Sequence, residues 1–368
     1  MLIHPSPYAL HDPALPQRRR WMIGMALMGT LQATHADYFD QYGLRPGSPE
    51  IDVGTQPSGF PSGVVSAVMR RDHVLQAALS ELGTTLRSPG FRRGADMLTL
   101  LADQRLDAAL LGDMPTLMAT ASGQAWVVGL VKQTSTALIA RDNMAMRALA
   151  GKRIAVVEAS SAHLTVLQGL AAAGLTEQQV ELVPMGVVDM PKALEDGVVD
   201  AFAAWEPFLT IALNRNPRNH VVFRGASSDY FVLSRAFVRR SPQAAQQLIA
   251  AFVRALEWMR ASQPNLEQAA RWAVADSERF SGAAPALTTA QVRAIVRREL
   301  LDVPSAPVLV DDGGPPRLKA EFEFLRRLGK LPVQASWTQV EAALGYDGLS
   351  QVMSNARHFQ LTRFDYRP

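Results

Sequence analysis

The sequence predicts an α/β fold in which short parallel strands alternate with helices. The main observation is the stretch Gly151–Phe208, where three aliphatic runs alternate with two segments of helical apolar spacing. A shorter pattern of the same kind ends at Asp113. Strand–helix–strand units build parallel sheets with right-handed crossovers, and their ligands bind beyond the carboxyl ends of the strands. We therefore expect the polar residues that follow each strand to form the functional site.

The composition excludes several classes of function. The chain has 368 residues, 19% charged and 48% hydrophobic, which is long enough for two cores and ordinary for a soluble globular protein. A net charge of +3 without a long basic run gives no sign of a nucleic-acid partner. The absence of cysteine removes thiol nucleophiles, thiolate metal sites, disulfides and a lipid-anchor residue, and the seven histidines show no ligand spacing. We predict no catalytic residue, no metal and no cofactor.

Residues 1–36 have the features of a cleaved export signal. Arg18–Arg20 precede the apolar run Trp21–Gly29, and small residues follow at Ala33 and Ala36. The run is shorter than the about 20 residues that span a bilayer. We expect cleavage near Ala36 and a periplasmic protein that is not a lipoprotein. The arginine pair also resembles a twin-arginine signal, and a buried or amphipathic N-terminal helix is the alternative.

The segment 50–145 is predicted to form the first part of one α/β lobe. Its expected elements are the strand Ile51–Gly54, the turn Thr55–Pro61, the helix Val64–Leu82, the strand Thr84–Arg87, the helix Ala95–Gln104, the strand Leu106–Leu111 and the loop Gly112–Pro115. Gln56 and Ser58 follow the first strand, and Asp113 and Met114 follow the last. All four are candidate ligand residues, and for the turn Thr55–Pro61 a plain surface turn is the alternative.

A polar segment separates two further expected strands, Val127–Val131 and Ala137–Ala140. Lys132, Ser135 and Thr136 lie in this segment, and Ser135 is a candidate ligand residue. Surface solvation would explain these side chains equally well.

The second lobe is predicted over 148–224. Its expected elements are the strand Gly151–Val157, a helix from about Leu164 to Gly174, the strand Val180–Val183, the helix Met190–Asp196 and the strand Val198–Ala204. Ser160, Ser161 and His163 stand at the start of the first helix. Unpaired amides and the positive end of the helix dipole favour an anion there, although simple N-capping is the alternative for the serines and an outward orientation for the histidine.

Two candidate residues lie just beyond the last strand of this segment. Trp205 offers a flat apolar wall and an indole donor to a ligand. Glu206 would pair with the amine of a zwitterionic ligand, or it would form a structural salt bridge across the lobes.

The remainder, 228–345, is predicted to return to the first lobe. The expected strand Val221–Phe223 ends the second lobe, the polar turn Gly225–Tyr230 and the strand Phe231–Ser234 follow it, and Asp229 in the turn is a candidate ligand residue. The expected helices are Gln243–Ser262, Leu266–Asp276, Thr289–Leu300, Arg317–Leu328 and Trp337–Leu344. We treat 346–368 as a C-terminal tail.

An internal sequence similarity supports two similar lobes. Leu101–Pro115 and Leu194–Phe208 share leucine, aspartate and alanine positions at a constant offset of 93, and each ends with an acidic residue beyond a strand. Two lobes that face each other across such loops would explain this similarity, and chance agreement over a short stretch is the alternative.

Several motifs resemble the solute-binding proteins of ABC importers for sulfonates, nitrate and taurine, a family that includes thiamine-precursor binders. They are Gly151–Val157, Ser160–His163, Gly197–Ala201, Trp205–Phe208, Gly112–Pro115 and Phe324–Pro332. The resemblance covers about Ile51 to Leu344, and the basic loop Gly90–Gly94 departs from it. It implies a two-lobed type II periplasmic-binding-protein fold in which two crossing strands join mostly parallel, helix-flanked sheets and the ligand cleft lies between the lobes. It also implies a small anionic or zwitterionic ligand, a permease partner in the inner membrane and a monomer.

Enzyme functions have little support in the sequence. No nucleophile elbow, P-loop, zinc-protease motif or dinucleotide glycine run is present. A desulfinating branch that resembles this family uses a cysteine nucleophile, which this chain lacks. A relative that uses Glu206 as a base, and a sensor module with the same cleft, remain alternatives. The ligand itself stays open among a sulfonate, a nitrate-like anion, a taurine-like zwitterion and a neutral pyrimidine.

Overall fold

The computed structural model describes residues 38–301, 306–309 and 317–367. The described residues from Tyr42 onward belong to one compact unit, which contains the features discussed below. The export signal expected in residues 1–36 lies outside the described residues. Among those described, no helix is long and apolar enough to cross a membrane.

The strands of the described chain form an eight-stranded sheet in the order β2-β1-β3-β8-β4-β7-β5-β6. Their bounds are β1 Ile51–Gly54, β2 Leu86–Arg87, β3 Ala108–Gly112, β4 Ala125–Arg141, β5 Arg153–Val156, β6 Glu181–Pro184, β7 Ala201–Ala204 and β8 Asn219–Ser234. Strand β1 pairs in parallel with β2 and β3, and β5 pairs in parallel with β6 and β7. The α/β prediction is confirmed: each end of the sheet is parallel. We call the end with β1–β3 the first lobe and the end with β5–β7 the second lobe.

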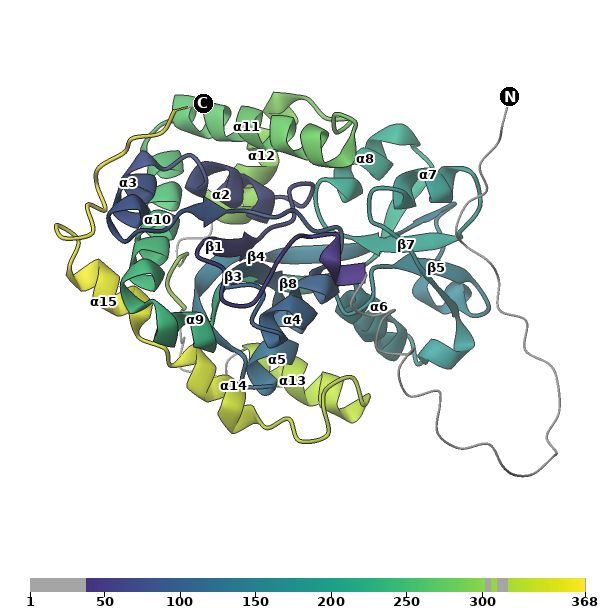
Figure 1. Ribbon diagram of the computed structural model, residues 1–368. Helices are drawn as coiled ribbons and strands as arrows, with labels where there is room; N and C mark the ends of the chain where they lie inside the picture. The colour runs from purple at the N-terminus through teal and green to yellow at the C-terminus, as the bar shows by residue number, and fades with distance from the viewer. Residues whose placement is uncertain (1–37, 302–305, 310–316, 368) are drawn as a thin grey trace, which may run out of the picture. The chain divides into compact units, whose positions relative to one another are not determined.

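Two long antiparallel strands connect the lobes. Strand β4 pairs with β8 along its whole length, from Ala125↔Ser234 to Arg141↔Asn219. Strand β8 also pairs with β3, and β4 with β7, so both strands belong to both lobes (Figure 1). The two crossing strands implied by the family resemblance are therefore present.

The prediction of four short strands in these regions was wrong. The segment around Lys132–Thr136 and the expected turn Gly225–Tyr230 are the middles of the two long strands, and they pair with each other. These residues are polar because they cross between two cores instead of lying inside one. Polar residues between aliphatic runs are also typical of turns, so the local pattern was misleading.

The helices of the described chain flank this sheet. Their bounds are α2 Ser62–Met69, α3 His73–Glu81, α4 Gly94–Ala102, α5 Asp113–Ala121, α6 Ser161–Ala172, α7 Met190–Glu195, α8 Phe208–Arg215, α9 Arg235–Arg240, α10 Pro242–Ala261, α11 Gln263–Ser281, α12 Thr289–Val296, α13 Arg317–Arg327, α14 Trp337–Leu344 and α15 Gly348–Ser354. Short 3-10 turns lie at η1 Met146–Leu149 and η2 Glu177–Gln179, and a π-helical turn, η3 Arg297–Leu301, follows α12.

The single helix expected over Val64–Leu82 is two helices, α2 and α3. Asp72 separates the two helices, because its carboxylate accepts the Leu75 amide (3.1 Å) and caps the start of α3. Apolar spacing continues past the break, so periodicity alone did not reveal it.

The core of the second lobe explains why its strands read as aliphatic runs. Ala155 packs into a cluster with α7 and α8, whereas Ile154 and Val156 pack into a cluster with α6. Figure 1 shows α7 and α8 on one side of β5 and β7 and α6 on the other. Because successive side chains point to opposite faces, a strand covered on both faces must be apolar at every position.

The C-terminal segment, treated above as a tail, contains α15 and returns to the first lobe. The His73 amide donates to the Asp365 carbonyl (3.0 Å), and Asp72 forms a backbone bridge with Tyr366. These contacts fix the chain end against the start of α3.

Candidate ligand-binding site

A small cavity of about 30 Å³ lies between the lobes, and we call it the inner cavity. Strands β4 and β8, the start of α6 and the turn before α2 all contribute to its wall. Its polar and aromatic lining consists of Gln56, Phe60, Ser62, Lys132, Thr136, Ser160, Ser161, Trp205 and Asp229. This volume is enough for very few non-hydrogen atoms.

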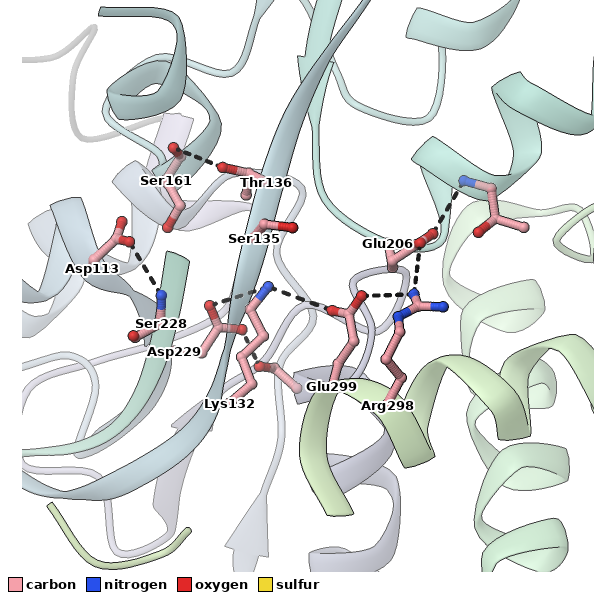
Figure 2. Close-up of polar contacts among 12 residues, drawn as sticks. Asp113, Lys132, Ser135, Thr136, Ser161, Glu206, Ser228, Asp229, Arg298 and Glu299 are labelled. Atoms are coloured by element: carbon pink, nitrogen blue, oxygen red, sulfur yellow. Dashed lines mark hydrogen bonds and ion pairs between the residues drawn. The ribbon is translucent and has the colours of Figure 1, made fainter. Parts of the chain in front are cut away.

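Lys132 is the most unusual residue of this lining. It is 1% exposed, and its Nζ lies 3.8 Å from Oδ1 of Asp229 and 4.0 Å from Oε2 of Glu299 (Figure 2). Within the described residues its Nζ donates no hydrogen bond, although an ammonium has three donors. A buried, charged donor group therefore faces the cavity with its hydrogen bonds unused.

The charge of Lys132 is stabilised from several sides. Burial opposes the charged form, but the carboxylates of Asp229 and Glu299, followed by those of Asp113 and Glu206, outweigh it and raise the pKa of Lys132. Lys132 is consequently a cation at neutral pH.

Two carboxylates hold Lys132 in place. Asp229 is directly across the sheet ladder from Lys132 and accepts the Ser62 hydroxyl (2.5 Å). Glu299 comes from the π-helical turn η3, where it also pairs with Arg298 (2.9 Å). Burial raises the pKa of Glu299, against the effect of Lys132. Ionic partners from both a strand and a distant helix thus fix the ammonium at the cavity wall.

The start of α6 forms the opposite wall. Ser160 caps the helix: its hydroxyl accepts the His163 amide (3.2 Å) and donates to the Val157 carbonyl (2.6 Å). The capping alternative for Ser160 is therefore confirmed. The amides of Ser161 and Ala162 have no acceptor among the described residues. Free amides at a helix N-terminus favour an anion.

Asp113 lies behind this wall. Its carboxylate accepts the amides of Met114 (2.8 Å) and Ser228 (3.2 Å), and Figure 2 shows the contact with Ser228. Burial raises its pKa despite these donors. Asp113 therefore links the start of α5 to strand β8, and it does not itself line the cavity.

Glu206 joins the lobes through its side chain and backbone. Its carboxylate accepts Arg298 (2.9 Å) and the Thr210 amide (3.1 Å), and its carbonyl accepts the Phe60 amide (2.8 Å). It lies outside the cavity lining. Of the two roles considered above, these contacts favour the salt bridge across the lobes.

Trp205 lines both the inner cavity and the neighbouring cavity described below. A Cβ at Gly59 would lie 2.9 Å from the Trp205 Nε1, so the close approach of the two lobes requires glycine there. A Cβ at Gly112 would similarly meet the Ser161 hydroxyl.

The candidate residues fall into two groups. Gln56, Ser160, Ser161, Trp205 and Asp229 line the inner cavity, and Ser58 lines a neighbouring cavity described below. Asp113, Met114, Ser135, His163 and Glu206 line neither. Ser135 accepts Arg224 (3.1 Å), and the buried His163 accepts the Ala159 amide (3.2 Å) and lies 3.7 Å from Glu177.

The sequence did not select Lys132, Thr136, Ser62, Arg298 or Glu299. For Lys132 the surface-solvation alternative was wrong, since the side chain is buried. The sequence did contain a signal for Lys132. Lys132–Thr136 and Gly225–Tyr230 are polar segments of similar length, each between aliphatic runs, and such segments can pair with each other in an antiparallel ladder. Nothing local marks Glu299, because its helix reaches the site only through the tertiary fold.

A buried carboxyl that feels the charge of Asp113 should make stability pH-dependent. Burial and the Asp113 charge raise the pKa of Glu321 on α13 to about 8, against the effect of Arg317. The unfolded carboxyl titrates near 4.3, so the folded state holds an extra proton between those values. This contribution is complete below about pH 4.3 and is lost as the pH rises through 8.

We expect the free energy of unfolding of the wild type to fall by a few kcal/mol between pH 5 and 8.5, since each pKa unit corresponds to about 1.4 kcal/mol. Glu321→Gln should remove that share of the dependence, and the exposed neighbour Glu323, changed to Gln, is the control. Urea unfolding at several pH values measures this. Parallel profiles for the wild type and Glu321→Gln would contradict it.

Comparisons with known proteins agree with the fold and the resemblance. Residues 91–265 match the family model described as NMT1/THI5 like. A putative aliphatic sulfonates-binding protein of Escherichia coli (strain K12) is 28% identical over 162 residues, 42% of this chain and 50% of that protein. Its counterpart from Bacillus subtilis (strain 168) is 25% identical over 222 residues, 57% of this chain and 65% of that protein. The chain thus matches about half to two thirds of these relatives' lengths.

Solved structures share the architecture. The alkanesulfonate-binding protein SsuA from Xanthomonas axonopodis pv. citri, bound to MOPS, has a TM-score of 0.62 at 21% identity, covering 82% of this chain and 99% of that one. The nitrate-binding protein NrtA from Synechocystis PCC 6803 has a TM-score of 0.63 at 12% identity, covering 84% and 89%. The desulfurization enzyme DszB has a TM-score of 0.52 at 16% identity, covering 85% and 100%.

Together these observations define a two-lobed type II periplasmic-binding-protein fold with its cavity between the lobes. The resemblance found in the sequence is confirmed: residues 91–265 match the NMT1/THI5-like model, and the chain is similar in sequence to two proteins named as putative aliphatic sulfonates-binding proteins. The nitrate-binding protein shares the fold. The same fold carries an enzyme, so the fold alone does not decide between binding and catalysis.

Proposed function

We propose that this protein is the solute-binding component of an ABC-type import system and that it captures a small anionic or zwitterionic solute such as a sulfonate. The single observation that carries the proposal is Lys132, a buried ammonium that lines the inner cavity and donates no hydrogen bond among the described residues. A buried charged donor without a strong acceptor is costly. An oxyanion in the cavity would supply that acceptor.

The opposite wall supports the same ligand class. The free amides of Ser161 and Ala162 and the Ser161 hydroxyl lie at the positive end of α6. A sulfonate has three oxygens, so it can accept from the ammonium and from the helix start together. Hydrogen bonds to charged groups contribute about 1.5–3 kcal/mol each.

The names of the relatives support a sulfonate over the other ligands. Both curated relatives are named as aliphatic sulfonates-binding proteins, and SsuA is bound to MOPS. By the same relationship we expect a permease partner, a monomer and a periplasmic location, and we expect native protein to lack residues 1–36 by mass spectrometry. An enzyme of the DszB kind is disfavoured because this chain contains no cysteine.

Thermal denaturation with added ligands tests the function. A ligand that binds only the native state stabilises it by RT ln(1 + [L]/Kd), about 2.7 kcal/mol at a hundredfold excess over Kd. We expect methanesulfonate or taurine to raise the Tm, and a neutral pyrimidine to leave it unchanged. Potassium chloride at equal ionic strength is the control. Stabilisation by the pyrimidine alone, or by none of these compounds, would refute the proposal.

A further inference from the structure

A second cavity of about 110 Å³ adjoins the inner one, and we call it the outer cavity. The two cavities share Gln56, Gly59 and Trp205 as common lining. Residues that border both cavities lie between them, so a molecule whose charged group contacts Lys132 would pass Trp205 to enter the outer cavity.

The apolar part of the outer cavity's wall is mainly aromatic. Phe91 and Phe280 from the first lobe and Trp205 from the second contribute three aromatic side chains, and Val187 contributes an aliphatic one. Polar side chains line the rest of the cavity: Gln56, Ser58 and Ser281 are neutral, and Arg92 and Asp189 at the edge are both exposed and carry opposite charges. The edge therefore does not select a charged end group, whereas the walls favour an apolar one.

These walls are held firmly. Phe91 is buried and packs on Tyr42 with ring centroids 4.4 Å apart. Val187 belongs to the core cluster of α7 and α8. The backbone at Gly90 passes so close to Phe280 that a Cβ would lie 2.7 Å from its ring. The basic loop Gly90–Gly94, which the sequence left unexplained, thus builds one side of this cavity.

We propose that the outer cavity binds the aromatic ring of an arylsulfonate whose sulfonate group lies in the inner cavity. This rests on the proposed function and names the ligand class more closely. A cavity of about 150 Å³ is known to hold benzene. At about 110 Å³, with a lining that includes exposed residues, the outer cavity takes most of a single ring and leaves its far edge at the surface.

Aromatic contacts should distinguish this class from saturated sulfonates. Offset or edge-to-face ring pairs contribute beyond the buried area, by an amount that corresponds to roughly twofold to tenfold in affinity. A nitrate ion or methanesulfonate has no group that fills the outer cavity. Cyclohexanesulfonate fills it without a π-system.

Calorimetric titration of the native protein, which we expect to lack residues 1–36, tests the proposal. The ligands are benzenesulfonate, cyclohexanesulfonate and methanesulfonate. We expect benzenesulfonate to bind roughly twofold to tenfold more tightly than cyclohexanesulfonate, and both to bind more tightly than methanesulfonate. Phe280→Leu keeps an apolar wall but removes a ring, so it should abolish most of the preference for benzenesulfonate and leave methanesulfonate unchanged. Phe364→Leu, at an exposed phenylalanine outside both cavities, is the matched control.

The outcomes separate this proposal from the function itself. If methanesulfonate binds but the two ring compounds bind no better, the outer cavity does not hold the ring and the proposal is wrong, whereas the proposed function stands. Equal affinities for the two rings, unaffected by Phe280→Leu, would also overturn it. If no sulfonate binds, both fail. Should Phe280→Leu not fold, Val188→Trp at the exposed edge should weaken both ring compounds selectively.

Discussion

Lys132→Met is expected to weaken sulfonate binding by about tenfold to more than a hundredfold. The substitution keeps a long apolar side chain and removes the ammonium, so the ligand loses hydrogen bonds to a charged donor, about 1.5–3 kcal/mol each. The loss should lie at the upper end of that range. Asp229 and Glu299, which Lys132 neutralises, would then face an anionic ligand without a counter-charge.

Titration calorimetry with methanesulfonate measures this effect. Lys152→Met is the control, because Lys152 precedes β5 and lines neither cavity. Lys132→Arg retains the positive charge and should keep part of the affinity if it folds. An affinity of Lys132→Met within about twofold of the wild type would show that the anion does not bind at this wall.

Arg254→Met is expected to lower the free energy of unfolding by about 3–5 kcal/mol. Arg254 on α10 is fully buried, and its guanidinium donates to the Asp72 carboxylate (2.8 Å) and to the Phe359 carbonyl (2.7 Å). Asp72 is also fully buried and caps α3. Removing one partner of a buried ion pair leaves an uncompensated charge, which is far more costly than the net contribution of the pair.

Urea unfolding followed by circular dichroism tests this, with Arg271→Met on the exposed face of α11 as the matched control, expected within about 0.5 kcal/mol of the wild type. The double variant Asp72→Asn/Arg254→Met should lose less than the sum of the single losses, because the two residues are in direct contact. Additive losses, or an Arg254→Met variant as stable as the control, would show that the pair does not act as a unit.

Part of the fold could be predicted because the residues that specify each of these elements lie close together in the sequence. The strands β1, β5 and β6 and the helices α6, α7 and α10 lie close to the predicted ranges, since each buries a face or a stripe that repeats along the sequence. The site residues that directly follow strand ends could also be predicted from the sequence. Ser160, Ser161 and Trp205 line the inner cavity because parallel strands bring their carboxyl ends to one edge.

The tertiary structure decided what the polar segments do. Lys132–Thr136 and Gly225–Asp229 have the composition of turns, but they pair with each other in the middle of β4 and β8. A turn and a cleft-crossing strand both require polar residues, so composition cannot separate them. Pairing partners about ninety residues apart are needed to make the distinction.

The sequence by itself determined the α/β class, the two lobes and the serines at the start of α6, because alternating apolar periods and helix-start residues act within a few positions of each other. Only the tertiary structure decided that Lys132 is buried between Asp229 and Glu299, and that Glu206 pairs with Arg298 (Figure 2). The physical reason is that a charge is stabilised by whatever lies within a few ångströms of it. Those neighbours come from helices and strands far apart in the chain.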